Sequence, residues 1–157
     1  MLSIADEVPD FELPGTSDRD EKSSYRLSDA LERGPVVLVF YPFDFHPACT
    51  DQLCTLRDFG WLDIRPDVTV FGVGPDSVYS HREYRQSHGF DFTLLSDSDR
   101  RVTAKYDVET ATLEGHREVP RRTVYVIDDT GRVRYRWQST GPDAETDIEE
   151  VVNSLKA

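Results

Sequence analysis

Two cysteines, Cys49 and Cys54, are the residues of this chain best suited to covalent chemistry, and both lie within "YPFDFHPACTDQLC" (residues 41–54). They are the only cysteines among 157 residues. A disulfide-stapled secreted fold carries a far higher cysteine density, so a reactive pair is favoured over a structural one. A thiol attacks as its thiolate, which the unpaired N–H groups and partial positive charge at the start of a helix stabilise. The alternative is an inert Cys49 that packs in the core.

The residues before Cys49 predict a loop at the carboxyl end of a central strand, where ligand crevices of open α/β sheets form. "VVLVFY" (36–41) is continuously apolar and β-branched, which is typical of a strand buried on both faces. Pro42 and Pro47 help to define the loop, since each fixes φ and removes an N–H donor. Beyond Pro47 apolar residues recur at near-helical spacing, so a helix is expected to begin at or just before Cys49. Its apolar positions are Leu53, Leu56, Phe59 or Trp61, and Leu62.

Strands and helices alternate through the rest of the chain, which predicts βαβ units and parallel strand pairing. Before the central strand, residues 14–24 are expected to form a surface loop or hairpin tip, and residues 26–34 a short helix with Ser28 as its N-cap. After the cysteines we expect strands at 68–74 and 92–96, and helices at 77–89 and 98–108.

The last third of the chain predicts an antiparallel hairpin followed by a helix. "TVYVID" (123–128) and "RVRYRW" (132–137) flank a tight-turn signal, and arginines alternate with apolar residues in the second strand, as at a half-exposed edge. Residues 143–157 read as an amphipathic helix over the sheet. The sum is an α/β fold of the thioredoxin-like kind, with a mixed central sheet and helices on both faces. We expect one domain over residues 1–157.

Three segments together resemble the peroxiredoxins, the thiol peroxidases of the AhpC/TSA type. "FYPFDFHPACTDQLCTLRD" (40–58) is similar to their active-site segment, in which a proline, three residues, a threonine or serine and two residues precede the peroxide-reactive cysteine; Pro42 and Cys49 match its ends. Residues 70–108 and "RRTVYVIDDTGRVRY" (121–135) resemble the second half-domain and the arginine-bearing hairpin. The second cysteine, five residues after the first, resembles the bacterioferritin comigratory protein subgroup, or Q type.

This resemblance implies a catalytic cycle for the two cysteines. Cys49 attacks a hydroperoxide, either hydrogen peroxide or an organic one, and becomes a sulfenic acid. Arg122 matches the active-site arginine of the family, a permanent cation with a fork of donors. Its neighbour Arg121 has the opposite strand parity, so only one of the two is expected to face the site. The sulfenic acid then condenses with Cys54 into an intramolecular disulfide, which thioredoxin or a similar dithiol reduces.

An intact helix opposes that disulfide. Residues five apart in a helix lie about 8.6 Å apart at Cα and point about 140° away from each other, whereas a disulfide tolerates at most about 7 Å. The helix around residues 48–55 is therefore expected to unwind locally in each cycle. Thr50, Asp51 and Thr55 favour this, because they are mediocre helix formers.

His46 departs from the family pattern, since it stands where peroxiredoxins have threonine or serine. An imidazole could replace the hydroxyl, with one nitrogen donating and the other accepting, and a protonated ring would lower the pKa of the Cys49 thiol. The alternative is that His46 points to solvent and the enzyme is slower.

Two other functions are weighed against the peroxidase. A thioredoxin-like copper or metal carrier would use Cys49, Cys54 and His46 as ligands, since thiolate and imidazole suit Cu(I) or Zn²⁺. A general disulfide reductase normally needs C-x-x-C, which is absent. "GVGPDS" lacks the G-x-G-x-x-G spacing, so no nucleotide cofactor is expected. His81 and His88, seven residues apart on a predicted helix, are expected at the surface rather than as ligands.

The net charge of −12 disfavours nucleic acid and anionic membranes as partners. Of the 18 lysines and arginines only Lys22, Lys105 and Lys156 are lysines, and the acidic residues are spread along the whole chain. That pattern indicates a solvated acidic surface suited to high salt, with an ordinary acidic protein as the alternative. No stretch predicts a signal peptide or a spanning helix, so we expect a cytoplasmic protein, either monomer or homodimer.

Overall fold

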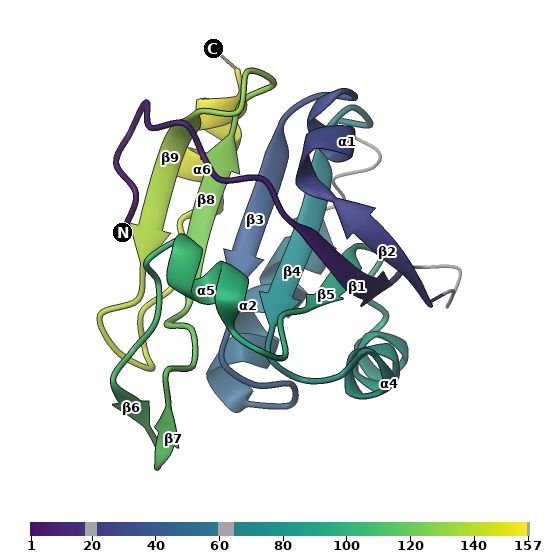
Figure 1. Ribbon diagram of the computed structural model, residues 1–157, viewed down its shortest axis with the longest axis vertical. Helices are drawn as coiled ribbons and strands as arrows, with labels where there is room; N and C mark the ends of the chain where they lie inside the picture. Colours follow the sequence, from purple (N-terminus) through teal and green to yellow (C-terminus); the bar gives the residue numbers. More distant parts are fainter. Residues whose placement is uncertain (18–21, 60–64, 157) are drawn as a thin grey trace.

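The computed structural model describes residues 1–17, 22–59 and 65–156. Its centre is a seven-stranded sheet in the order β2-β1-β5-β4-β3-β8-β9 (Figure 1). The strands are β1 (Glu12–Thr16), β2 (Lys22–Arg26), β3 (Val36–Phe40), β4 (Thr69–Gly74), β5 (Thr93–Ser96), β8 (Thr123–Ile127) and β9 (Val133–Gln138). A separate hairpin pairs β6 (Thr112–Leu113) with β7 (His116–Arg117). Strands β3, β4 and β5 are parallel, whereas β1, β2, β8 and β9 pair antiparallel.

Helices cover both faces of the sheet, as the sequence predicts. They are α1 (Leu27–Leu31), α2 (Pro47–Phe59), α4 (Val78–His88), α5 (Arg101–Lys105) and α6 (Ile148–Leu155). In Figure 1, α1 and α5 lie in front of the sheet and α2 and α6 behind it. Within the described ranges no helix combines the length and apolar character needed to cross a bilayer.

Strand β3 holds the two layers together because it is buried on both faces. Val37 and Val39 point into the core that includes the α2 side, while Val36 and Leu38 point into the core that includes the α1 and α5 side. All five β3 residues are buried. The continuous apolar run therefore forms a strand buried on both faces, as predicted. The chain passes from the end of β3 into the loop before α2.

The predicted order of strands and helices is confirmed, and the predictions at the amino end need correction. Strands β1 and β2 extend into residues 14–24, and the tip at 18–21 lies outside the described residues. Ser28 is not the N-cap of α1, which begins one residue earlier. Instead the Asp10 carboxylate accepts from the Ser28 N–H at 2.9 Å and from its hydroxyl at 2.9 Å. A side chain distant in sequence thus supplies the cap.

One hairpin was not predicted, and the prediction for the end of α2 cannot be checked. The β6–β7 hairpin was missed because each strand has only two residues, and the Glu114–Gly115 turn has positive φ at both positions. Trp61 and Leu62, predicted to continue the apolar face of α2, lie outside the described residues.

Helix α4 overturns the prediction that His81 is a surface residue. His81 is 0% exposed, and Tyr84 and Arg85 on the same face are also buried. Residues three and four apart share one helix face. Because Tyr84 packs into the core, the polar residues His81 and Arg85 beside it on α4 are buried too. His88, one further step along this face, is half-buried.

Gly74 at the end of β4 makes room for Tyr41, the residue that follows β3. A Cβ at Gly74 would lie 3.1 Å and 3.2 Å from the Tyr41 ring and 3.3 Å from the Tyr41 carbonyl oxygen. Because backbone as well as ring would have to shift, Gly74→Ala should destabilise the fold by about 1–3 kcal/mol. Gly141→Ala is the matched control, since a Cβ there meets nothing within 4 Å. Urea unfolding of both variants measures the difference, and equal stabilities would contradict the prediction.

Candidate active site

The loop before α2 positions Cys49 in the first turn of the helix. Helix α2 begins at Pro47, and the Thr50 N–H donates to the His46 carbonyl oxygen at 2.9 Å, so His46 is the residue that caps the helix through its backbone. Cys49 is then the third helical residue, where N–H groups have no partner inside the helix. The predicted placement of the sulfur at the start of a helix beyond a central strand is confirmed.

Burial changes the expected state of that sulfur. Cys49 is 0% exposed. Burial raises the pKa of the Cys49 thiol to about 12, against the opposing effects of the Phe43 backbone and of the Arg122 charge. The nearby Asp44 carboxylate adds to the rise in pKa. A thiolate was predicted at Cys49, whereas in this structure the desolvation of the anion outweighs the groups that stabilise it.

Arg122 lies beside Cys49, at the start of β8, and is nearly buried. Its Nη2 donates to the loop after β9, with the Gly141 carbonyl at 2.9 Å, the Ala144 carbonyl at 3.0 Å and the Ser139 hydroxyl at 3.1 Å. The guanidinium also lies 5.8 Å from the centroid of the Trp137 ring. These contacts hold the guanidinium near the sulfur, although Arg122 lies far from Cys49 in the sequence.

The two neighbouring arginines, Arg121 and Arg122, differ in burial but not in the pocket that they line. Arg122 is buried and Arg121 is exposed, as alternation requires. However, both line the same pocket of about 300 Å³. The two residues precede the first residue of β8, Thr123, so the alternation of a regular strand does not constrain them.

His46 lines this pocket too, together with Pro42 from the loop between β3 and α2 (the Cys49 loop, residues 41–46), Ala48 from the first turn of α2 and Leu113 from β6. The His46 Nε2 lies 3.9 Å from the Glu114 carboxylate, and about a fifth of the side chain is exposed (19%). The other ring nitrogen, Nδ1, is buried and has no hydrogen-bond partner among the described residues. The imidazole therefore does not point freely into solvent, and its buried nitrogen has no hydrogen-bond partner among the described residues.

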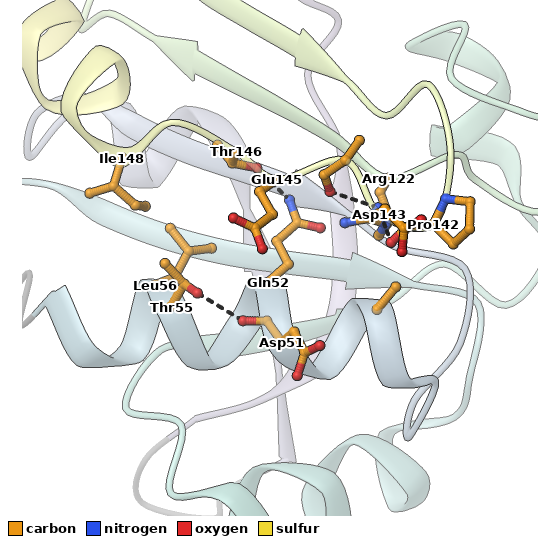
Figure 2. Close-up of a pocket in the computed structure, with 12 residues that line it drawn as sticks. Asp51, Gln52, Thr55, Leu56, Arg122, Pro142, Asp143, Glu145, Thr146 and Ile148 are labelled. Atoms are coloured by element: carbon orange, nitrogen blue, oxygen red, sulfur yellow. Dashed lines mark hydrogen bonds between the residues drawn. The ribbon is translucent and has the colours of Figure 1, made fainter.

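Cys54 lies on the same uninterrupted helix as Cys49, and both cysteines are free. Three side chains fix α2 to its surroundings: Thr50 Oγ1 lies 2.7 Å from the Tyr84 hydroxyl, Gln52 Nε2 donates to Thr146 Oγ1 at 3.0 Å, and Arg57 Nη1 donates to the His88 carbonyl at 2.5 Å. Figure 2 shows Gln52 reaching from α2 toward the segment that leads into α6, across a pocket of about 280 Å³.

A buried polar cluster beside the loop was missed by the sequence analysis. Asp44 accepts from His81, Ser80 and Tyr41, and its backbone N–H donates to Asp76. The one available signal was the spacing of His81 three residues before Tyr84, which places both on one face of α4. Nothing local to Asp44 indicates a buried partner 37 residues away.

A thiol at the start of a helix, beside a guanidinium and at the carboxyl end of a mixed sheet, defines a thiol-dependent redox protein of the thioredoxin-like class. Comparisons with known proteins agree with this class. The sequence profile of the AhpC/TSA family matches residues 4–136. A putative peroxiredoxin bcp of Coxiella burnetii is 32% identical over 157 residues, which span 98% of this chain and 99% of the relative.

Further relatives support the same family. A chloroplastic peroxiredoxin Q of Oryza sativa subsp. japonica is 39% identical over 134 residues, 85% of this chain and 58% of that protein. The crystal structure of peroxidoxin BcpB from Mycobacterium tuberculosis superposes with a TM-score of 0.83 at 31% identity and covers 99% of this chain and 97% of that one. This chain belongs to the AhpC/TSA family, and the resemblance to the bacterioferritin comigratory protein and Q type is confirmed.

The metal-carrier alternative is not favoured. Within residues 1–17, 22–59 and 65–156, no three His, Cys, Asp or Glu side chains are grouped so that they could hold a metal ion. The helix that carries Cys49 and Cys54 turns their sulfurs apart, and His46 faces Glu114 instead.

The raised pKa of Cys49 predicts that the reduced protein loses stability in mild alkali. The unfolded chain releases this proton near pH 8.5, while the folded chain holds it up to about pH 12. Between these values the unfolded state binds fewer protons, so the free energy of unfolding falls by up to about 1.4 kcal/mol per pH unit as pH rises. Tyrosines contribute only above about pH 10.

Urea unfolding under reducing conditions between pH 8 and pH 10 measures this slope. Cys49→Ala should flatten it, whereas Cys54→Ala should reduce it less, because Cys54 is only partly buried. The same slope in wild type and Cys49→Ala would show that Cys49 is already ionised in the folded protein.

Proposed function

We propose that this peroxiredoxin is a thiol peroxidase that reduces hydrogen peroxide and organic hydroperoxides at Cys49, with Cys54 as the resolving cysteine. The observation that carries the proposal is the position of Cys49 in the first turn of α2, within reach of the charge of Arg122, which lines a pocket together with His46. A hydroperoxide entering that pocket would meet the guanidinium and the imidazole before the sulfur.

Arg122 is proposed to bind the peroxide oxygens. Among the described residues, the hydrogen bonds of Arg122 all come from Nη2, so the guanidinium has further N–H groups with which to hold a substrate. As the O–O bond breaks, charge develops on the leaving oxygen. A cation fixed in place before the reaction stabilises that charge without reorganisation.

The proton of Cys49 is proposed to pass through His46 to the leaving oxygen. Because burial keeps Cys49 as a thiol, its proton has to leave as the sulfur attacks. The unpartnered His46 Nδ1 accepts it, and Glu114 lies on the other side of the ring. The sulfur bonds to the terminal peroxide oxygen, the O–O bond breaks, and the leaving oxygen takes the proton from His46. One thiol and one hydroperoxide thus give one sulfenic acid and one alcohol or water.

The second half of the cycle requires α2 to open. The Cys54 thiol attacks the sulfenic acid, a disulfide forms and water leaves, after which a dithiol such as thioredoxin restores both thiols. Thr50 and Gln52 would have to release Tyr84 and Thr146 during this unwinding. The physiological dithiol, the oligomeric state and the cytoplasmic location stay predictions.

Mass spectrometry after one equivalent of hydrogen peroxide tests the roles of the cysteines. Wild type should lose two mass units and show a peptide cross-link between Cys49 and Cys54. Cys54→Ser should instead gain oxygen at Cys49, as a sulfenic acid that dimedone captures, because no second thiol remains in the chain. Cys49→Ser is the control and should remain unmodified; oxidation at Cys54 in that variant at the wild-type rate would overturn the assignment.

A pair of substitutions at His46 tests its role as proton carrier. His46→Phe keeps a ring and removes both nitrogens, so the rate of Cys49 oxidation should fall by about tenfold to a hundredfold. His46→Thr installs the residue of the family pattern and should retain most of the rate. Stopped-flow tryptophan fluorescence measures both, and a wild-type rate in His46→Phe would refute the role.

A further inference from the structure

His81 is a buried histidine whose two ring nitrogens both face acceptors. Nε2 lies 3.0 Å from the Leu95 carbonyl oxygen and 3.4 Å from that of Gly74. Nδ1 lies 2.7 Å and 2.9 Å from the two Asp44 carboxylate oxygens. The exposed fractions of the His81 and Asp44 side chains are 0% and 1%. A carbonyl oxygen cannot donate, so Nε2 carries a proton.

The distances also indicate the role of Nδ1. A neutral ring with its proton on Nε2 would need a donor at Nδ1, and among the described residues the hydroxyl in contact with Nδ1 is that of Tyr41, at 3.3 Å. That hydroxyl lies closer to Asp44 Oδ1, at 2.7 Å, and donates there. The Ser80 hydroxyl donates to the other carboxylate oxygen at 2.8 Å. Since both Asp44 oxygens accept from hydroxyls, we assign Nδ1 of His81 as a third donor to the carboxylate.

We propose that Asp44 and His81 form a buried carboxylate–imidazolium pair that positions the Cys49 loop, with a proton on each ring nitrogen of His81. Asp44 lies in this loop, and His81 lies on α4. The pair ties the loop to the carboxyl ends of β4 and β5 through Gly74 and Leu95. The Asp44 N–H adds a main-chain tie to the Asp76 carboxylate at 2.7 Å.

The pair acts on Cys49 in two ways. Phe43, next to Asp44, supplies the backbone hydrogen bond that lowers the pKa of the Cys49 thiol, so a fixed Asp44 fixes that group too. The Asp44 charge raises the same pKa, and the positive charge of His81 at 2.7 Å offsets this effect. His81 and Asp44 are therefore positioning residues, because they touch neither the sulfur nor its substrate.

Other ionisable groups around the pair have to be considered in any pH experiment. They are Tyr41 after β3, Asp76 after β4, Cys49 on α2, Tyr84 on α4, and His116 on β7, which faces Asp76. None of them lies between Asp44 and His81, whose atoms are in direct hydrogen-bond contact.

The protonation of His81 is tested on the wild-type protein. Nitrogen-15 NMR of the imidazole side chains at pH 7 should show a proton on both His81 nitrogens, with the half-buried His88 of the same helix as an internal comparison. A His81 ring with one unprotonated nitrogen at pH 7 would overturn the proposal. This measurement needs no variant and no peroxidase activity.

The positioning role is tested with His81→Asn, whose amide can still donate to Asp44 but carries no charge. The rate constant for alkylation of Cys49 by iodoacetamide at pH 8 should fall about tenfold, because the Asp44 charge loses its compensation and the thiolate fraction falls. A merely structural defect would lower the fraction of reactive protein and leave the rate constant of the remaining fraction in place. Arg82→Gln, an exposed charge removal at the next residue of α4, should match wild type.

The outcomes separate this proposal from the proposed function on which it rests. A folded His81→Asn with an unchanged rate constant for Cys49 alkylation would refute positioning by the pair. If instead wild-type protein fails to reduce peroxide, the peroxidase proposal fails, while the NMR and alkylation results still decide whether the pair exists and acts on Cys49. If His81→Asn does not fold, the NMR spectrum of wild type alone decides the protonation state.

Discussion

The opposition between burying the Cys49 sulfur and stabilising its anion is the constraint on which the rest of the structure depends. The sulfur is inaccessible in the closed state, and burial dominates its pKa. The start of α2, the Phe43 backbone and Arg122 all act in the other direction. A site of this kind shields the thiol from solvent. Binding of substrate, or a movement of the loop, is then needed to lower the pKa of Cys49.

The same helix has two incompatible tasks. In the proposed cycle it has to be intact to hold Cys49 near Arg122, and it has to open for Cys54 to reach the oxidised sulfur. The contacts of α2 reflect both demands, because it is anchored by a few polar side-chain contacts with α4 and the segment before α6, alongside its buried Leu53 and Leu56. Individual hydrogen bonds of this kind contribute about 1 kcal/mol each, so they orient the helix without making its unwinding prohibitive.

Helix α4 supports the site from behind with polar rather than apolar side chains. His81 binds the Cys49 loop, Tyr84 contacts Thr50 on α2, and Arg85 donates to the carbonyl oxygens of Phe90 and Phe92 before β5. A face of this composition is usually read as solvent-exposed. Each of its buried polar groups has partners here, which is what burial of polar groups demands.

The sequence by itself determined most strands, most helices and the placement of Cys49 at the start of a helix, because apolar periodicity and the position of Cys49 after a buried run are local properties of the chain. It also pointed to Arg122 and His46 through a family resemblance. Only the tertiary structure decided the cap of α1 by Asp10, the pairing of Asp44 with His81, and the burial that sets the pKa of Cys49. These depend on which segments the sheet order brings together and on how much water remains around them, and neither quantity can be obtained from spacing along the chain.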